Sequence, residues 1–134
     1  MSDLLWQLGA METAELISKK DVSTREVIQN HLGRLTEVNP KINAITRSLN
    51  DEAMEMAILA DEKISRNEQV GPLHGVPVTI KDNVDITGQS SPNGVSKLKD
   101  NLAPANSPVV DNLLKAGAIP IGRTNTPEFS LRWH

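Results

Sequence analysis

GVPVTIKDN, residues 75–83, and AIPIG, residues 118–122, are the two stretches that set the fold class. Each is rich in β-branched side chains, which favours a strand in both. Between them, Ser107 and Pro108 match the N-cap and first residue of a helix, and Gly117 matches the residue after its C-terminus. Strand, helix and strand form a βαβ unit, so the sequence predicts two parallel strands with a right-handed crossover.

The first strand, residues 76–81, alternates between two faces. Its period of two places Val76, Val78 and Ile80 on one face and Pro77, Thr79 and Lys81 on the other. Pro77 has no backbone N–H to donate to a neighbouring strand. We therefore expect it at the start of the strand or on an edge of the sheet.

The first 70 residues are predicted to be helical. Ser23 and Glu26 have the spacing of a capping box, and apolar residues then recur at helical spacing over residues 23–38. The residue before a proline avoids helical geometry, so we expect this helix to end at Asn39-Pro40. Shorter periodic segments predict helices over residues 13–20 and about 50–66.

The remaining segments agree with an α/β fold. Residues 87–106 contain many Gly, Pro, Ser and Asn residues and are predicted to form a long loop. Thr126-Pro127-Glu128 is predicted to open another helix, which would still be incomplete at Trp133-His134. Two parallel strands alone leave edges and apolar faces uncovered. We therefore expect the chain to be the N-terminal part of one larger domain, poorly stable or self-associating when isolated, with a helical segment (1–70) and the start of a sheet core (71–134).

Composition excludes several classes of protein. Of 134 residues, 38% are hydrophobic and 23% charged, as in ordinary soluble proteins. A net charge of −3, two Trp, one Phe and no Tyr argue against a nucleic-acid-binding surface. The absence of Cys excludes a thiolate nucleophile and Cys-ligated metals. No membrane span or signal peptide is recognisable, so a cytoplasmic location is expected.

Lys81 is the main candidate for chemistry. It closes an apolar strand at the C-terminal end, where open α/β sheets bind their ligands. From position alone, the favoured interpretation is a solvent-exposed lysine at a strand end, without a catalytic role. The alternative is a desolvated amine that acts as a base or forms a Schiff base.

Six motifs, taken in order, favour the catalytic interpretation. The chain resembles the amidase signature family along nearly its whole length. The resemblance is carried by NPKINA (39–44), GPLHGVP (71–77), GVPVTIKDN (75–83), SPVV (107–110), LLKAGA (113–118) and GRTNTPEF (122–129). Each motif is short, but their order and spacing together are specific.

The resemblance implies a large, helix-covered mixed sheet and a Ser–cis-Ser–Lys amidase that cleaves a carboxamide to a carboxylate and ammonia or an amine. Lys81 matches the family's lysine, which must be uncharged to act as a base; burial beside uncharged hydroxyl groups favours that form. Strand alternation directs Asp82 to the opposite face, so it need not pair with Lys81. Both catalytic serines are expected beyond residue 134, which makes the segment inactive alone. Ser90 and Ser91 are interpreted as loop serines.

The other polar residues are predicted to be structural. His31 is interpreted as a partly buried core residue, and His74 as a support for its turn. These two and His134 are far apart in sequence, so neither a metal nor a cofactor is predicted. Arg123 is expected either to contact substrate or to hold the next turn by hydrogen bonds, and the second is the favoured interpretation.

Three alternative functions stay open at this point. The family resemblance also fits a transamidating subunit that amidates aminoacyl-tRNA. Amphipathic helices such as residues 23–38 fit a structural or association module. Without the resemblance, Lys81 fits a Schiff-base lyase. The expected partner is a small-molecule amide, without nucleic acid or membrane, and the chain is compatible with a homo-oligomer.

Overall fold

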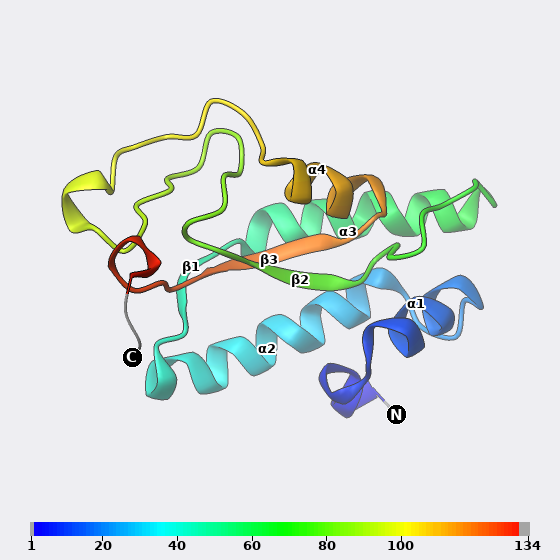
Figure 1. Cartoon of the computed structure of the whole chain (residues 1–134). Coiled ribbons are helices and arrows are strands. Elements are labelled where there is room, and N and C mark those ends of the chain that lie inside the picture. Colours follow the sequence, from blue (N-terminus) through cyan, green and yellow to red (C-terminus); the bar gives the residue numbers. More distant parts are fainter. Residues whose placement is uncertain (1, 132–134) are drawn as a thin grey trace.

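The computed structural model describes residues 2–131, which form helices around a small mixed sheet (Figure 1). The α-helices are α1 (Ala10–Ser18), α2 (Thr24–Ile42), α3 (Asn50–Ser65) and α4 (Pro108–Lys115), and the strands are β1 (Ile45–Ser48), β2 (Pro77–Lys81) and β3 (Ile119–Thr124). Three short 3-10 helices cover η1 (Ser2–Gln7), η2 (Ser96–Leu98) and η3 (Glu128–Ser130). Figure 1 shows α4 above the sheet and α2 below it.

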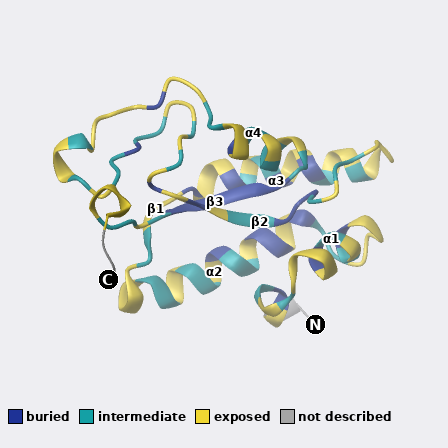
Figure 2. Cartoon of the chain, in the orientation of Figure 1, coloured by how far each residue is buried: buried dark blue, intermediate teal, exposed yellow. Residues whose placement is uncertain are grey.

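The sheet contains the predicted βαβ unit. Its order is β1-β3-β2, with β2 and β3 parallel and α4 between them in sequence. β2 therefore lies on one edge of this sheet, and Pro77 is its first residue, as predicted from the missing N–H. β3 is the central strand and is buried along nearly its whole length (Figure 2).

β1 was not predicted from the sequence. This strand pairs antiparallel with β3, so the sheet has a third strand and is mixed. β1 has four residues, three of them exposed, and therefore carries no apolar pattern that would mark it as a strand. Its position is fixed by long-range pairing, with Ile45 opposite Thr124 and Ser48 opposite Gly122.

The prediction that Asn39-Pro40 ends the second helix was wrong. α2 continues to Ile42 with Pro40 inside its last turn. Pro40 cannot donate to the carbonyl four residues earlier and its ring crowds that carbonyl, and only two more residues of α2 follow it. The helix ends at Asn43, which has a left-handed φ of 48° and donates its N–H to the carbonyl of Asn39. The Asn39 side chain then holds the N–H and carbonyl of Ile45, so it leads the chain into β1.

The other predicted helices differ mainly at their ends. α1 begins before the predicted residue 13 and ends at Ser18, while α3 covers almost the predicted range. The prediction of an α-helix opening at Thr126 was wrong. Up to residue 131, where the description of the structure ends, the chain forms the 3-10 turn η3 there. Phe129 and Ser130 have φ values of 47° and 57°, which an α-helix does not tolerate. Trp133 and His134 lie outside the described residues.

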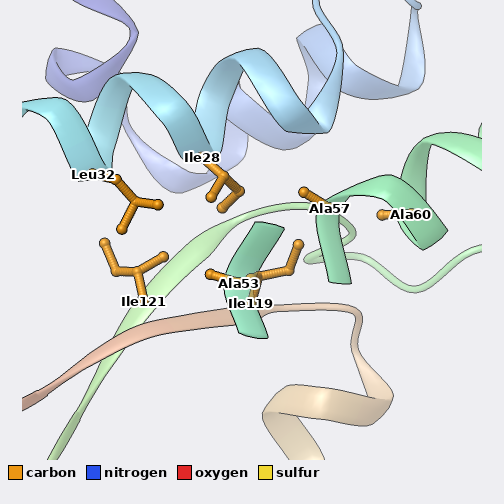
Figure 3. Packing of buried hydrophobic residues seen from close by; sticks show 7 residues of the cluster. All are labelled: Ile28, Leu32, Ala53, Ala57, Ala60, Ile119 and Ile121. Atoms are coloured by element: carbon orange, nitrogen blue, oxygen red, sulfur yellow. The ribbon is translucent and has the colours of Figure 1, made fainter. Parts of the chain in front are cut away.

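The main hydrophobic core joins α2, α3 and β3 (Figure 3). Ile28 and Leu32 of α2 face Ile119 and Ile121 of β3. The residues that α3 contributes are small: Ala53, Ala57 and Ala60. Small side chains let the helix approach closely, so this core fixes β3 and, through its pairing, the end of β2.

Residues 87–106 form a long connection, as predicted. Apart from the short helix η2, the described backbone there has no regular helix or extended strand. Backbone hydrogen bonds from Gly88 to the carbonyl of Ala103 and from Ser91 to that of Asn101 bring its two arms together. The loop follows the C-terminal end of β2, where Lys81 lies (Figure 1).

The capping box of α2 gives a stability prediction. Ser23 Oγ accepts from the N–H of Glu26 at 3.2 Å, and the Glu26 carboxylate accepts from the N–H of Ser23 at 2.8 Å. Ser23→Ala should cost about 1 kcal/mol of local stability. We expect roughly fivefold faster hydrogen exchange in the first turn of α2, measured on the complete protein. Ser65→Ala, at an exposed serine near the end of α3, should leave that turn unchanged.

The same contact sets the direction of a pH effect. Hydrogen bonds from the backbone and hydroxyl of Ser23 lower the pKa of Glu26 from its ordinary 4.5. A carboxylate with a lowered pKa stabilises the folded state above its unfolded pKa and loses that contribution as pH falls. Ser23→Ala keeps the backbone N–H and removes only the hydroxyl bond to the carboxylate, so the part of the stability difference that this bond carries should be lost below about pH 4.5. An undiminished difference in acid would show that Glu26 does not carry it.

Candidate functional site

Lys81 is the last residue of β2, at the C-terminal edge of the two parallel strands. It lies opposite Thr124, the last residue of β3, so both strands end at the same place. The Lys81 side chain is exposed. Residues 2–131 therefore do not themselves form the dry environment that a catalytic amine needs.

A tight turn follows Lys81. The N–H of Val84 donates to the carbonyl of Lys81 at 2.9 Å, and the N–H of Asp82 donates to the carbonyl of Thr124, also at 2.9 Å. These bonds fix the Lys81 backbone on both sides: one closes the turn and the other ties it to β3. The position of Lys81 is thus set by the sheet and not by a free loop.

Asp82 points away from Lys81, as strand alternation predicts. It is buried, and its Oδ2 accepts from the hydroxyl of Thr46 in β1 at 2.7 Å. Its Oδ1 lies 3.5 Å from Nε of Arg123, within ion-pair distance. The negative charge next to Lys81 in the sequence is therefore directed to Arg123.

Arg123 holds a turn by hydrogen bonds, but it is the turn after β2 and not the next turn along the chain, which the sequence interpretation favoured. Its side chain is 1% exposed, and its Nη2 donates to the carbonyls of Lys81 at 3.2 Å and Val84 at 2.8 Å. Burial lowers the pKa of Arg123, while the charges of Asp82 and Asp85 oppose that shift. Despite this shift, a guanidinium keeps its charge at neutral pH. The turn is therefore built around a buried cation.

The two loop serines are not placed as a catalytic pair. Ser90 donates its hydroxyl to the carbonyl of Lys99, and its backbone bridges to Leu102. Ser91 is buried, and its Oγ has no hydrogen-bond partner among the described residues. Both belong to the long connection after β2, as the sequence analysis interpreted them.

The described histidines have structural contacts. Nδ1 of the half-buried His31 lies 2.9 Å from the carbonyl of Val27, one turn earlier in α2. Nε2 of the buried His74 lies 3.1 Å from the carbonyl of Ala60, which ties its turn to α3. His134 lies outside the described residues. Within residues 2–131, no three histidine, aspartate or glutamate side chains come together as metal ligands.

The cluster of Thr46, Asp82 and Arg123 was missed as a unit. Its members come from β1, the turn after β2, and β3, which are distant in the sequence. One signal did exist: an arginine that ends the apolar stretch 118–122 needs a buried partner, and Asp82 follows the neighbouring strand. The contribution of Thr46 could not be anticipated without β1.

A sequence profile described as Amidase matches residues 26–133, most of the chain. The chain belongs to the amidase family. The match spans all three strands and the turn after Lys81, so the family resemblance seen in the short motifs is confirmed. The mixed α/β architecture also agrees with that of solved amidase signature proteins.

Individual relatives support the family assignment. The chain is 48% identical over 128 residues to an indoleacetamide hydrolase of Bradyrhizobium diazoefficiens. The aligned segment covers 96% of this chain and 24% of that protein. The chain is 39% identical over 127 residues to a glutamyl-tRNA(Gln) amidotransferase subunit of Thermoanaerobacter pseudethanolicus, covering 95% and 26%. Among solved structures, a bacterial aryl acylamidase of the amidase signature family aligns with a TM-score of 0.86 and 31% identity, covering 91% and 26%.

This chain of the amidase family thus spans about a quarter of the length of these relatives. In the part that the structure describes, no helix is long and apolar enough to cross a bilayer.

Proposed function

We propose that the complete protein containing residues 1–134 is an amidase that hydrolyses a carboxamide to a carboxylate and ammonia or an amine. The observation that carries this proposal is Lys81, held at the C-terminal edge of β2 inside the family match. In this proposal residues 1–134 are the N-terminal part of a single amidase domain. A cytoplasmic location and association between copies stay predictions.

The proposed reaction uses Lys81 as the base of a Ser–cis-Ser–Lys triad. The neutral amine takes a proton, through one serine, from the hydroxyl of the other, which attacks the amide carbon. The C–N bond then breaks, the relayed proton leaves with the nitrogen, and water hydrolyses the acyl-serine ester. Both serines are proposed to come from polypeptide outside residues 1–134, which also buries Lys81.

A small aromatic acetamide is the substrate class we favour. The relative that is 48% identical is named an indoleacetamide hydrolase, whereas the amidotransferase relative is 39% identical. The solved aryl acylamidase also has a name that denotes cleavage of an amide bearing an aromatic group. These names support a free-standing hydrolase over a transamidating protein.

The test is an assay of the complete protein with indole-3-acetamide. We expect equal amounts of ammonia and indole-3-acetic acid, without added nucleotide or tRNA. Residues 1–134 alone should give neither product. Activity confined to glutamine with glutamyl-tRNA and partner subunits would instead assign the transamidating function.

The same assay separates the amidase from a Schiff-base lyase. An amidase forms an ester on serine and no imine, so borohydride should trap no substrate on Lys81. Mass spectrometry of the treated protein makes the distinction. A reduced adduct on Lys81 would contradict the proposed mechanism, and absence of any amide-cleaving activity would contradict the proposed function.

A further inference from the structure

Arg123 contacts the turn after Lys81 at three points. Its Nη2 donates to the carbonyls of Lys81 and Val84, the two ends of the turn, and its Nε lies 3.5 Å from the carboxylate of Asp82 inside the turn. The guanidinium is 1% exposed and comes from the central strand β3. The turn is therefore built on a rigid and buried group.

This arrangement constrains the direction of the Lys81 side chain. The Lys81 carbonyl accepts from both Arg123 and the N–H of Val84, while the next N–H is bonded to Thr124. Asp82 points inward toward Arg123, so the Lys81 side chain emerges on the other face. Both the carbonyl and the N–H of the peptide group that follows Lys81 are thus held, and rotation of this peptide would break these bonds.

We propose that Arg123 is a positioning residue for the Lys81 amine, acting through the backbone of the 81–84 turn. This inference rests on the proposed amidase function. A planar guanidinium is suited to it because Nη2 reaches two carbonyls of the turn while Nε faces the carboxylate of Asp82, and Nη1 donates to Oε1 of Gln89 at 3.5 Å. A misplacement of about 1 Å at a reacting group costs as much as 10²-fold in rate.

The test compares Arg123→Gln and Arg123→Lys in the complete protein, with the indole-3-acetamide assay. Glutamine loses the charge and the reach of the fork, so kcat should fall about 10–100-fold while KM changes less than about threefold. Lysine keeps the charge but not the fork, so its kcat should lie between those of the wild-type and glutamine proteins. Because a loss of folded protein also lowers the apparent kcat without changing KM, kcat is expressed per folded molecule, with the folded fraction measured by circular dichroism.

Arg47→Gln is the matched control. Arg47 lies beside Arg123 in the register of β1 and β3 but is exposed, with Glu52 only 3.9 Å away as an ion partner. The kcat of this variant should equal that of the wild-type protein.

Wild-type kcat in Arg123→Gln, with Lys81→Met inactive, would overturn the inference and leave the proposed function intact. If Arg123→Gln does not fold, wild-type kcat in Arg123→Lys overturns it, and a kcat per folded molecule that is reduced with KM unchanged supports it. Full turnover in Lys81→Met would overturn the proposed function itself, and the inference with it.

Discussion

Lys81→Met in the complete protein is expected to lower kcat by about 10²–10⁴-fold, the range that a positioned acid–base group contributes. Methionine has a similar length and no amine, so the serine hydroxyl would lose the group that takes its proton. Substrate binding should change little, because the amine is proposed to act on protons and not on the amide. The measurement is steady-state hydrolysis of indole-3-acetamide, with kcat and KM determined separately.

The structure makes this substitution interpretable. Lys81 is exposed, and no hydrogen bond or ion pair of its side chain is present in the described part of the chain. Its removal therefore leaves the core of α2, α3 and β3 intact. Lys81→Arg should be as inactive as Lys81→Met, because a guanidinium retains its proton at neutral pH.

Lys115→Met is the matched control. Lys115 is also exposed, but it ends α4, before the start of β3, and thus belongs to the opposite end of the parallel strands. Its turnover should match that of the wild-type protein. Wild-type turnover in Lys81→Met would mean that this lysine merely meets water, the interpretation that its position alone favoured.

The elements that the sequence predicted well have strong local signals. α2 starts with a capping box at Ser23, and β2 and β3 have β-branched side chains beside turn residues. β1 has no such signal because it is short and mostly exposed, and it exists through pairing with β3. Pro40 misled the prediction because the residue before a proline usually avoids helical geometry, whereas Asn39 is helical here and the helix ends at Asn43.

The sequence allowed the position of the candidate site at Lys81 to be predicted, but not the side-chain contacts around it. The position of Lys81 at a strand end was predicted from a sequence motif. The alternation of side chains along the strand correctly predicted that Asp82 points away from Lys81. The partner of Asp82 depends on which strands lie side by side, which the missed strand β1 partly decides. A turn-holding role was favoured for Arg123, but for the turn that follows it in the chain; the turn it holds begins at Lys81, on the neighbouring strand.

Asp82→Ala is expected to produce the largest loss of stability in this part of the protein. The substitution leaves the Arg123 guanidinium buried without the carboxylate beside it, and leaves the Thr46 hydroxyl without that acceptor. Removing one partner of a buried ion pair costs about 3–5 kcal/mol, since an uncompensated charge stays inside. Hydrogen exchange of the β3 amides in the complete protein should accelerate by about two to four orders of magnitude.

Two further variants separate the charge from the packing. Asp82→Asn keeps the shape and an oxygen that can accept from Thr46 but loses the charge, so its effect should be intermediate, about 1.5–3 kcal/mol. Asp85→Ala removes an exposed carboxylate that also acts on Arg123, and should change stability by less than about 0.5 kcal/mol. If Asp82→Ala were as mild as Asp85→Ala, the carbonyls of Lys81 and Val84 and the side chain of Gln89 would be sufficient partners for the buried cation. A large effect in Asp82→Ala with a small one in Asp85→Ala would instead identify the Asp82 charge as what keeps Arg123 inside the sheet.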